Sequence, residues 1–259
     1  MRKYGVDKDG FIKTEVGLNK IKPPFTKILT HCKAEIVNKL GDKIHSLYIY
    51  GSVATGKAYA KKSDLDLLLV LKNKPTSKIK EQVDLLQRSL SDKHKHLVRE
   101  VGISLTFFNE VKNDHFGWGC FIKHLSVCVY GEDISRGLPK FKPSKEVAKA
   151  FNGDIAKHID NILKKFKSPS KESEILLTCS QIMKKIVRTG FCLVMDEEKS
   201  WTTDLKKSYQ IFSKYYLKQA PLMKKALDFV KKPVADKKML GKFLENFGSW
   251  LSEEAKKKL

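Results

Sequence analysis

The chain has 259 residues, of which 41% are hydrophobic and 10% aromatic. This composition supplies a hydrophobic core and excludes a wholly disordered chain. No apolar run reaches the roughly eighteen residues of a membrane span. The N-terminal segment MRKYGVDKDGF lacks the apolar stretch of a secretory signal. We therefore expect a cytoplasmic protein without a membrane anchor.

The charge balance is strongly basic. Lys and Arg total 51 against 29 Asp and Glu, which gives a formal net charge of +22. Such a balance favours polyanionic partners such as nucleic acids or nucleotide phosphates. Nearly all of the cations are Lys and they are spread along the chain, whereas two-point recognition of phosphate prefers Arg. Two interpretations therefore remain open, a nucleic-acid partner and an ordinary solvated surface.

The residue types that bind transition metals show no ligand pattern. The five cysteines are Cys32, Cys120, Cys128, Cys179 and Cys192, and none forms a Cys-x-x-Cys pair. Their odd number and mostly apolar contexts predict buried reduced thiols and argue against a disulfide framework or a zinc site. The Lys-His-Lys-His segment at 93–96 is predicted to be a solvated, charged loop.

Hydrophobic periodicity predicts an α/β first half and an α-helical second half. In the first half we expect helices over 25–40 and 77–90, strands over 46–50, 65–71 and 101–108, and a helix running into a short strand over 118–130. In the second half we expect helices over 145–166, 172–195, 203–217, 221–230 and 236–257. The segment 135–145 contains two prolines and a glycine and is the best linker candidate. The predicted domains are therefore 1–137 and 138–259.

The most informative stretch runs from Tyr50 to Val70 and reads YGSVATGKAYAKKSDLDLLLV. Asp64 and Asp66 lie at the start of the strand predicted over 65–71. Because side chains alternate along a strand, both carboxylates are expected to project from the same face. Adjacent carboxylates repel each other unless a cation lies between them, and hard oxygen ligands select Mg²⁺ or Mn²⁺. The sequence therefore predicts a divalent metal site here.

Gly51 and Ser52 directly follow the strand predicted over 46–50. A Gly-Ser turn at a strand end offers close backbone approach, free N–H groups and a hydroxyl, which suit the outer phosphates of a nucleoside triphosphate. Lys57 and Ser63 complete the predicted nucleotide-binding set.

The pattern Gly-Ser, spacer, Asp-x-Asp resembles the signature of the nucleotidyltransferase superfamily of the DNA polymerase beta type. The most similar branch is the two-domain one that includes aminoglycoside nucleotidyltransferases. The motif covers about residues 46–71, and the two-domain layout extends the resemblance over the chain. The resemblance implies an α/β (α+β) N-terminal domain with a mixed sheet, followed by an all-α helical bundle. It also implies that Gly51 and Ser52 hold the phosphates and that Asp64 and Asp66 bind the metal.

The family usually adds a third carboxylate on a following strand. In the segment REVGISLTFF at 99–108, the positions on one strand face are Glu100, Gly102 and Ser104. The third acid would most naturally fall at 102 or 104, where there is none. Glu100 has the right parity but lies early, so it is the candidate catalytic acid beside Asp64 and Asp66, with an exposed strand-entry charge as the alternative. Acids available from the second half are Asp196, Glu197, Glu198 and Asp204, of which Asp204 also fits a helix N-cap.

By this resemblance, we expect Mg²⁺-dependent (or Mn²⁺-dependent) transfer of a nucleoside monophosphate, from ATP or another triphosphate, to an acceptor hydroxyl. Two alternatives stay open. A catalytically lapsed nucleotide-binding module would explain the missing third acid, and an RNA- or tRNA-directed transferase would explain the +22 charge. The expected partners are the nucleoside triphosphate and an unidentified acceptor, without a membrane, in a monomer or homodimer.

Overall fold

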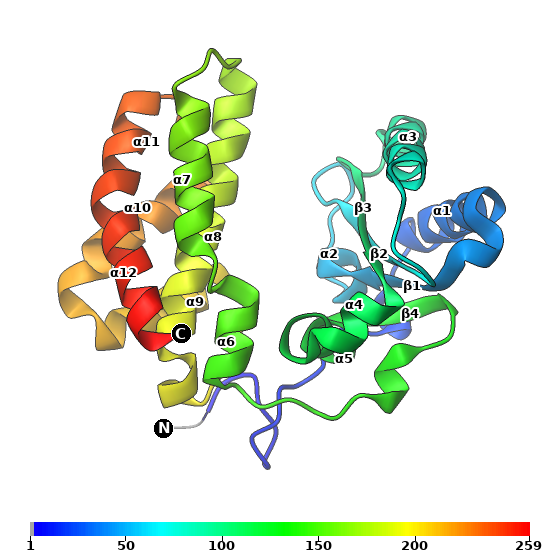
Figure 1. Ribbon diagram of the computed structural model, residues 1–259, viewed down its shortest axis with the longest axis horizontal. Helices are drawn as coiled ribbons and strands as arrows, with labels where there is room; N and C mark the ends of the chain where they lie inside the picture. The colour runs from blue at the N-terminus through cyan, green and yellow to red at the C-terminus, as the bar shows by residue number, and fades with distance from the viewer. Residues whose placement is uncertain (1–2) are drawn as a thin grey trace. The chain divides into compact units, whose positions relative to one another are not determined.

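The computed structural model describes residues 3–259, which form two compact units (Figure 1). One unit spans Lys13–Phe141 and contains a β-sheet. The other is helical and combines residues 3–12 with Lys142–Leu259. The expected succession of a mixed-sheet domain and a helical region is thereby confirmed. The predicted domain boundary between residues 137 and 138 stays a prediction.

A four-stranded mixed sheet organises the first unit. Its strands are β1 (Ile44–Tyr50), β2 (Leu65–Leu71), β3 (Val101–Phe107) and β4 (Ser126–Gly131). They lie in the order β3-β2-β1-β4, with β2 parallel to β3 and the other pairs antiparallel. β2 is therefore a central strand, which explains why LDLLLVL is apolar on both faces. All four strands predicted from periodicity are present.

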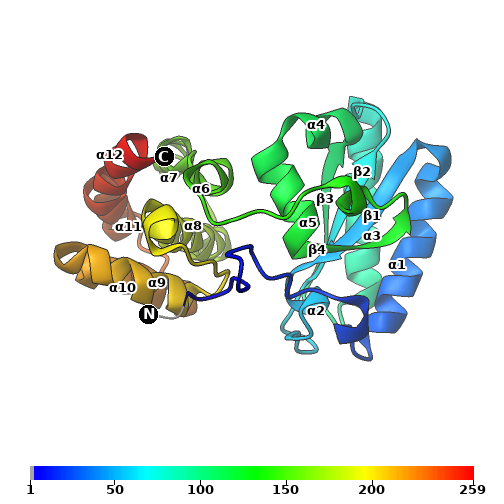
Figure 2. The same ribbon diagram turned by 90° about the horizontal axis from the view of Figure 1, so that it is seen from below.

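Helices cover both faces of the sheet (Figure 2). On one face lie α1 (Phe25–Leu40) and α3 (Ser77–His94), packed on the side chains of Leu65, Leu67 and Leu69. On the other face, Tyr48, Leu68 and Val70 pack against α4 (Phe108–Asn113) and α5 (Cys120–Leu125). Asp66 has the parity of Leu68 and therefore belongs to this second face. The short helix α2 (Gly51–Ala54) connects β1 to the loop before β2.

The helix predicted over 25–40 is α1, with the same bounds. Its buried residues, Phe25, Ile28, Cys32, Ile36 and Leu40, recur every three or four positions and form one apolar stripe. Gly41 then follows in a conformation with φ of +51°, which ends the helix.

The prediction of a solvated loop over 93–96 was wrong for its first histidine. α3 extends to His94, four residues beyond the expected end. Its ring nitrogen Nε2 lies 2.9 Å from Nδ1 of His31 in α1, so His94 is half-buried between two helices. Periodicity within one helix carries no information about such a contact.

The second unit is a helical bundle built around α8 (Glu172–Glu198), which packs on five other helices of the unit. The remaining helices are α6 (Lys145–Asn152), α7 (Ile155–Phe166), α9 (Leu205–Tyr215), α10 (Ala220–Lys231), α11 (Lys237–Phe243) and α12 (Ser249–Lys258). Single-turn 3₁₀ segments are Leu18–Lys20, Gly41–Lys43, Ile134–Gly137 and Leu217–Gln219, and π-helical turns are His115–Gly119 and Leu244–Gly248. Within the described range, no helix combines the length and apolar character of a membrane span.

Two of the predicted helices in the second half differ from the structure. The helix expected over 145–166 is divided into α6 and α7, because the chain turns at Gly153 and Asp154. The helix expected over 236–257 is continuous but contains the π-helical turn Leu244–Gly248. All five cysteines are free thiols, as predicted, although Cys128 is only half-buried.

Candidate active site

The first part of the candidate site is the turn from β1 into α2. Gly51 begins α2 with φ of +72°, a conformation that side chains rarely adopt. A Cβ at this position would collide with Oδ2 of Asp66. Glycine is therefore required both by the backbone conformation and by the approach of the Asp66 carboxylate.

The hydroxyl of Thr55 stabilises this turn through hydrogen bonds to its main chain. Thr55 Oγ1 lies 3.2 Å from the carbonyl oxygen of Gly51 and 3.1 Å from that of Ser52, and it donates to them. The N–H groups in the first turn of a helix have no intrahelical partner and point towards the helix start. α2 thus begins, at Gly51, beside the Asp66 carboxylate, and the backbone donors of such a turn suit an anionic ligand.

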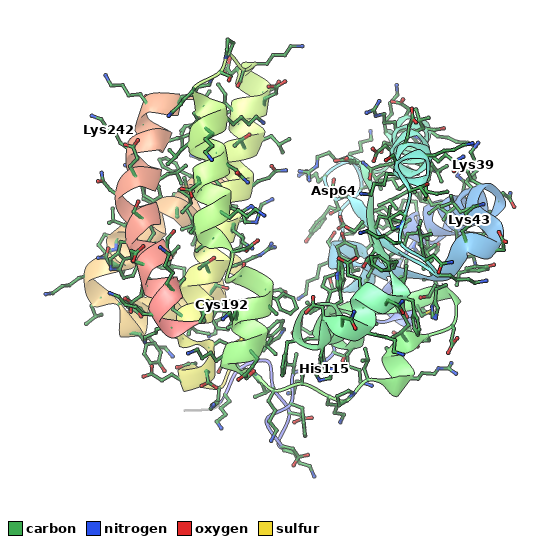
Figure 3. All side chains as sticks on the ribbon, in the orientation of Figure 1. Lys39, Lys43, Asp64, His115, Cys192 and Lys242 are labelled. Carbon is green, nitrogen blue, oxygen red and sulfur yellow. The ribbon has the colours of Figure 1, made fainter. Side chains whose placement is uncertain are left out.

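The second part of the site is the start of β2. Asp64 precedes the strand by one residue and forms a two-point ion pair with Arg99, whose Nε lies 2.8 Å from Oδ1 (Figure 3 labels Asp64). This pairing raises the pKa of the Arg99 guanidinium. Arg99 lies shortly before β3. Because β2 and β3 are parallel, the residues that precede the two strands lie at the same end of the sheet.

Both carboxylates act on Tyr50, the last residue of β1. Burial raises the pKa of Tyr50, and the negative charges of Asp66 and Asp64 raise it further. The Tyr50 hydroxyl lies 3.0 Å from Oγ of Ser104. Tyr50 is also the register partner of Asp66 in the antiparallel pair of β1 and β2. The structure therefore places Tyr50 next to Asp66, and the charges of both predicted metal ligands favour its protonated form.

The strand expected to supply a third acid is β3. Its register places Gly102 beside Asp66 and Ser104 beside Leu68. A Cβ at Gly102 would lie 3.5 Å from Oδ1 of Asp66, which is ordinary van der Waals contact. Position 102 is thus where a third carboxylate would lie close to Asp66, and glycine occupies it.

Glu100 lies just before β3, and its main-chain oxygen accepts from the N–H of Leu65. Its side chain is exposed, with Oε1 3.5 Å from Nε2 of Gln87 in α3. Gln87 also accepts from the N–H of Ile103 through Oε1, so it lies along the outer edge of β3. The structure therefore shows the Glu100 carboxylate engaged at that edge, and its catalytic role stays a prediction.

The other predicted nucleotide-binding residues are engaged elsewhere. Lys57 is exposed and its Nζ lies 3.4 Å from Oε2 of Glu15. The hydroxyl of Ser63 accepts from the N–H of Tyr59 at 2.9 Å and closes the loop that precedes Asp64. Both residues flank the site along the chain, and their contact with a nucleotide stays a prediction.

The four acids considered in the second half all have partners within the helical unit. Asp204 caps α9 by accepting from the N–H of Lys207 at 2.7 Å, which confirms the N-cap interpretation. Glu198 accepts from Tyr215 at 2.7 Å and from Lys214 at 3.0 Å. Asp196 pairs with Lys199, and Glu197 lies 4.0 Å from Lys258.

Comparison with known proteins defines the class of the chain. Residues 33–116 match the model of the family described as polymerase beta, nucleotidyltransferase. A putative protein adenylyltransferase of Methanocaldococcus jannaschii is 31% identical over 91 residues, which are 34% of this chain and 91% of that protein. The chain therefore belongs to the nucleotidyltransferase family of the polymerase beta type, as its motif predicted.

A solved structure shares the two-part architecture. It is that of spectinomycin adenyltransferase AAD(9) from Enterococcus faecialis with ATP and spectinomycin. The match has a TM-score of 0.53 and covers 89% of this chain and 99% of that one, at 16% sequence identity. It confirms the fold of a mixed-sheet part followed by helices, as expected for the aminoglycoside branch.

Sequence reasoning missed three residues of this site. Arg99 pairs with Asp64, Tyr50 is the register partner of Asp66, and Thr55 stabilises the turn at Gly51. Of these three residues, only Arg99 could have been found from the sequence, because it lies just before β3 in the same way as Asp64 lies just before β2. The pairing of the two residues can be predicted once the two strands are known to be parallel.

Proposed function

We propose that this enzyme transfers a nucleoside monophosphate from a nucleoside triphosphate, with ATP as the first candidate, to an acceptor hydroxyl in a Mg²⁺-dependent reaction. One observation carries the proposal: the Asp66 carboxylate packs directly on Gly51, at the turn that presents the start of α2. Family membership supports nucleotidyl transfer as the reaction class. The choice of metal, nucleotide and acceptor belongs to the proposal.

The residues present fit a divalent metal ion. Asp64 and Asp66 supply hard oxygen ligands, and the absence of a side chain at both Gly51 and Gly102 leaves room around the Asp66 carboxylate. When bound, Mg²⁺ would neutralise negative charge on the phosphates and on the attacking oxygen. Asp64 and Asp66 would hold it, and Asp64 must exchange its Arg99 partner to do so.

The chain's own groups have distinct roles in this proposal. The backbone of Gly51 and the hydroxyl of Ser52 orient the outer phosphates through hydrogen bonds. Once released from Asp64, the Arg99 guanidinium can bind a phosphate oxygen in the two-point geometry that arginine favours. Tyr50 stays protonated because its pKa is raised, so it can donate a hydrogen bond at the edge of the site.

The test is incubation of the full chain with Mg²⁺ and each of the four labelled ribonucleoside triphosphates. Candidate acceptors are a small polyhydroxylated molecule, an RNA and a protein, and pyrophosphate release is the readout. We expect Mg²⁺-dependent release that requires an acceptor. Transfer that persists with chelator, or an Asp64→Asn, Asp66→Asn double variant that retains full turnover, would contradict the proposal.

A second candidate function is a nucleotide-binding module with little or no transferase activity. Gly102 favours it, because this position beside Asp66 carries no carboxylate. The two candidates share nucleotide binding and differ in turnover. Binding of a Mg²⁺-triphosphate complex without pyrophosphate release, for all three acceptor classes, would support the second.

The two comparison proteins suggest different acceptors. AAD(9) is described with spectinomycin, a small molecule, whereas the archaeal relative is described as a protein adenylyltransferase. The net charge of +22 favours an anionic acceptor such as RNA over a cationic one. We therefore rank RNA first, and a steep loss of acceptor affinity between low and high salt is the expected signature.

A further inference from the structure

A second cluster of chemically active side chains lies between α1 and α3, on the sheet face opposite to that of Asp66. It consists of His31 and Cys32 of α1 and His94 of α3, whose nearest ligand-type atoms all lie within 4.8 Å of one another. The nucleotidyltransferase site uses none of these residues. His31 and Cys32 are adjacent in the sequence, but His94 lies more than sixty residues further along the chain, which explains why no ligand spacing appears in the sequence.

One ring nitrogen of His31 lies close to one ring nitrogen of His94. Nδ1 of His31 lies 2.9 Å from Nε2 of His94. The other nitrogen of His31, Nε2, lies 2.8 Å from Nζ of Lys93, and an ammonium group can only donate. In the tautomer that accepts from Lys93 through Nε2, His31 carries its proton on Nδ1 and donates it to Nε2 of His94.

We propose that His31, Cys32 and His94 form a binding site for a transition metal ion of the zinc class. Two imidazole nitrogens and one thiolate are ligands that Zn²⁺ prefers, at about 2.0–2.1 Å and 2.3 Å from the ion. In a tetrahedral site, such ligand atoms lie about 3.3–3.6 Å apart. The observed separations are compatible with this after side-chain rotation. A fourth position would remain for water.

The neighbouring residues account for the protons. Binding transfers the His31 proton from Nδ1 to Nε2, and it releases the Cys32 thiol proton to solvent. Oε1 of Glu35 lies 3.4 Å from Nε2 of His31 and becomes the acceptor, while Lys93 swings away. A carboxylate on the far nitrogen of a ligand histidine is the usual second partner in zinc sites.

Electrostatics around the cluster set the conditions for binding. Burial lowers the pKa of His94, and the neighbouring basic groups of His31, His96 and Lys93 lower it further, which favours the neutral imidazole that a metal ion requires. Burial raises the pKa of Cys32 to about 12, so the thiol carries its proton until the metal displaces it.

The test is Zn²⁺ titration of the tag-free, full-length chain in competition with a chromophoric chelator. Excess Mg²⁺ in all solutions occupies the hard carboxylate sites. We expect one equivalent to bind, and Co²⁺ in its place to give the absorption of a cobalt–thiolate bond. His31→Gln and His94→Gln should each weaken binding by more than about 100-fold, and Glu35→Gln by about 10–100-fold. Cys32→Ser should remove the thiolate absorption.

The matched control is His158→Gln. His158 is exposed and, like His31, lies near a carboxylate, with Nε2 2.8 Å from Oδ2 of Asp154 in the other unit. We expect unchanged Zn²⁺ affinity in this variant. Circular dichroism must show a native spectrum for each variant, and His94→Gln tests the site even if Cys32→Ser fails to fold. Wild-type affinity in both His31→Gln and His94→Gln, or no specific binding by the wild type, would overturn the proposal.

Discussion

Gly102 of β3 is the register partner of Asp66 of β2, and a Cβ added to Gly102 would lie 3.5 Å from Oδ1 of Asp66. A side chain at 102 would therefore begin beside the Asp66 carboxylate without steric conflict at its Cβ. We expect Gly102→Asp to raise Mg²⁺-dependent turnover, within the 10²–10⁴-fold range typical of a supplied acid–base group.

Pyrophosphate release measures this effect, with Gly137→Asp as the control because no atom lies within 4 Å of a Cβ at Gly137. In the same assay Glu100→Gln tests the predicted catalytic role of Glu100, and a change in turnover of less than about threefold would agree with its side chain contacting Gln87 instead. A loss of 10² or more in Glu100→Gln would make Glu100 the third acid.

Asp64→Asn and Asp66→Asn should each abolish Mg²⁺-dependent triphosphate binding. The substitution keeps the shape of the side chain and removes the charge on which the metal depends. Titration with a fluorescent triphosphate analogue, with and without Mg²⁺, measures the effect. Asp84→Asn, an exposed position on α3, is the control and should bind as the wild type. Equal affinity in all three variants would place the metal elsewhere.

Gly51→Ala should destabilise the protein and block the nucleotide. The substitution imposes strain of about 1–3 kcal/mol at positive φ and also pushes a methyl group into Asp66. Gly41→Ala is the matched control, because Gly41 has φ of +51° but nothing within 4 Å of its Cβ position. Thermal unfolding should show a larger loss in Gly51→Ala, and only that variant should lose triphosphate binding.

Ser52→Ala should have a milder effect than Gly51→Ala. Loss of one hydroxyl contact with a phosphate costs about 1.5–3 kcal/mol if the bond is charge-assisted. We expect a matching rise in the triphosphate Kd without a change in the unfolding temperature. Unchanged affinity would show that the phosphates do not contact Ser52.

Arg99→Ala should separate metal binding from phosphate binding. In this variant no guanidinium competes with the metal ion for the Asp64 carboxylate, so Mn²⁺ should bind more tightly in the absence of nucleotide. Electron paramagnetic resonance, which detects free Mn²⁺, measures this affinity. Triphosphate affinity should fall in the same variant because a phosphate partner is lost. Arg99→Lys should retain part of the affinity. A parallel loss of both affinities would assign Arg99 a structural role only.

Acidification should destabilise the first unit through His45. Burial lowers the pKa of His45, and Lys72 lowers it further against the opposing effect of Glu132; the ring stacks on Phe108 with centroids 4.4 Å apart. The unfolded state therefore binds the proton more readily than the folded state, so this contribution is full above about pH 6.5 and is lost as the pH falls below it. When the pH is lowered from about 7.5 to 5.5, the unfolding temperature of His45→Gln should fall by less than that of the wild type.

The sequence by itself determined the class of this protein and most of its elements. The Gly-Ser and Asp-x-Asp spacing identified the family, because phosphate and metal binding impose residue types at short, local distances. Periodicity located α1 and β2 with their observed bounds. A helix buried on one face and a strand buried on both faces each require a specific pattern of apolar residues along a short stretch of sequence.

The tertiary structure decided which residues meet across elements. The parallel register of β2 and β3 pairs Arg99 with Asp64 and puts Gly102 beside Asp66, and the packing of α1 on α3 joins His31 to His94. None of these contacts follows from spacing along the chain. They depend on strand order and helix packing, which are set by the burial of the whole core and not by any single segment.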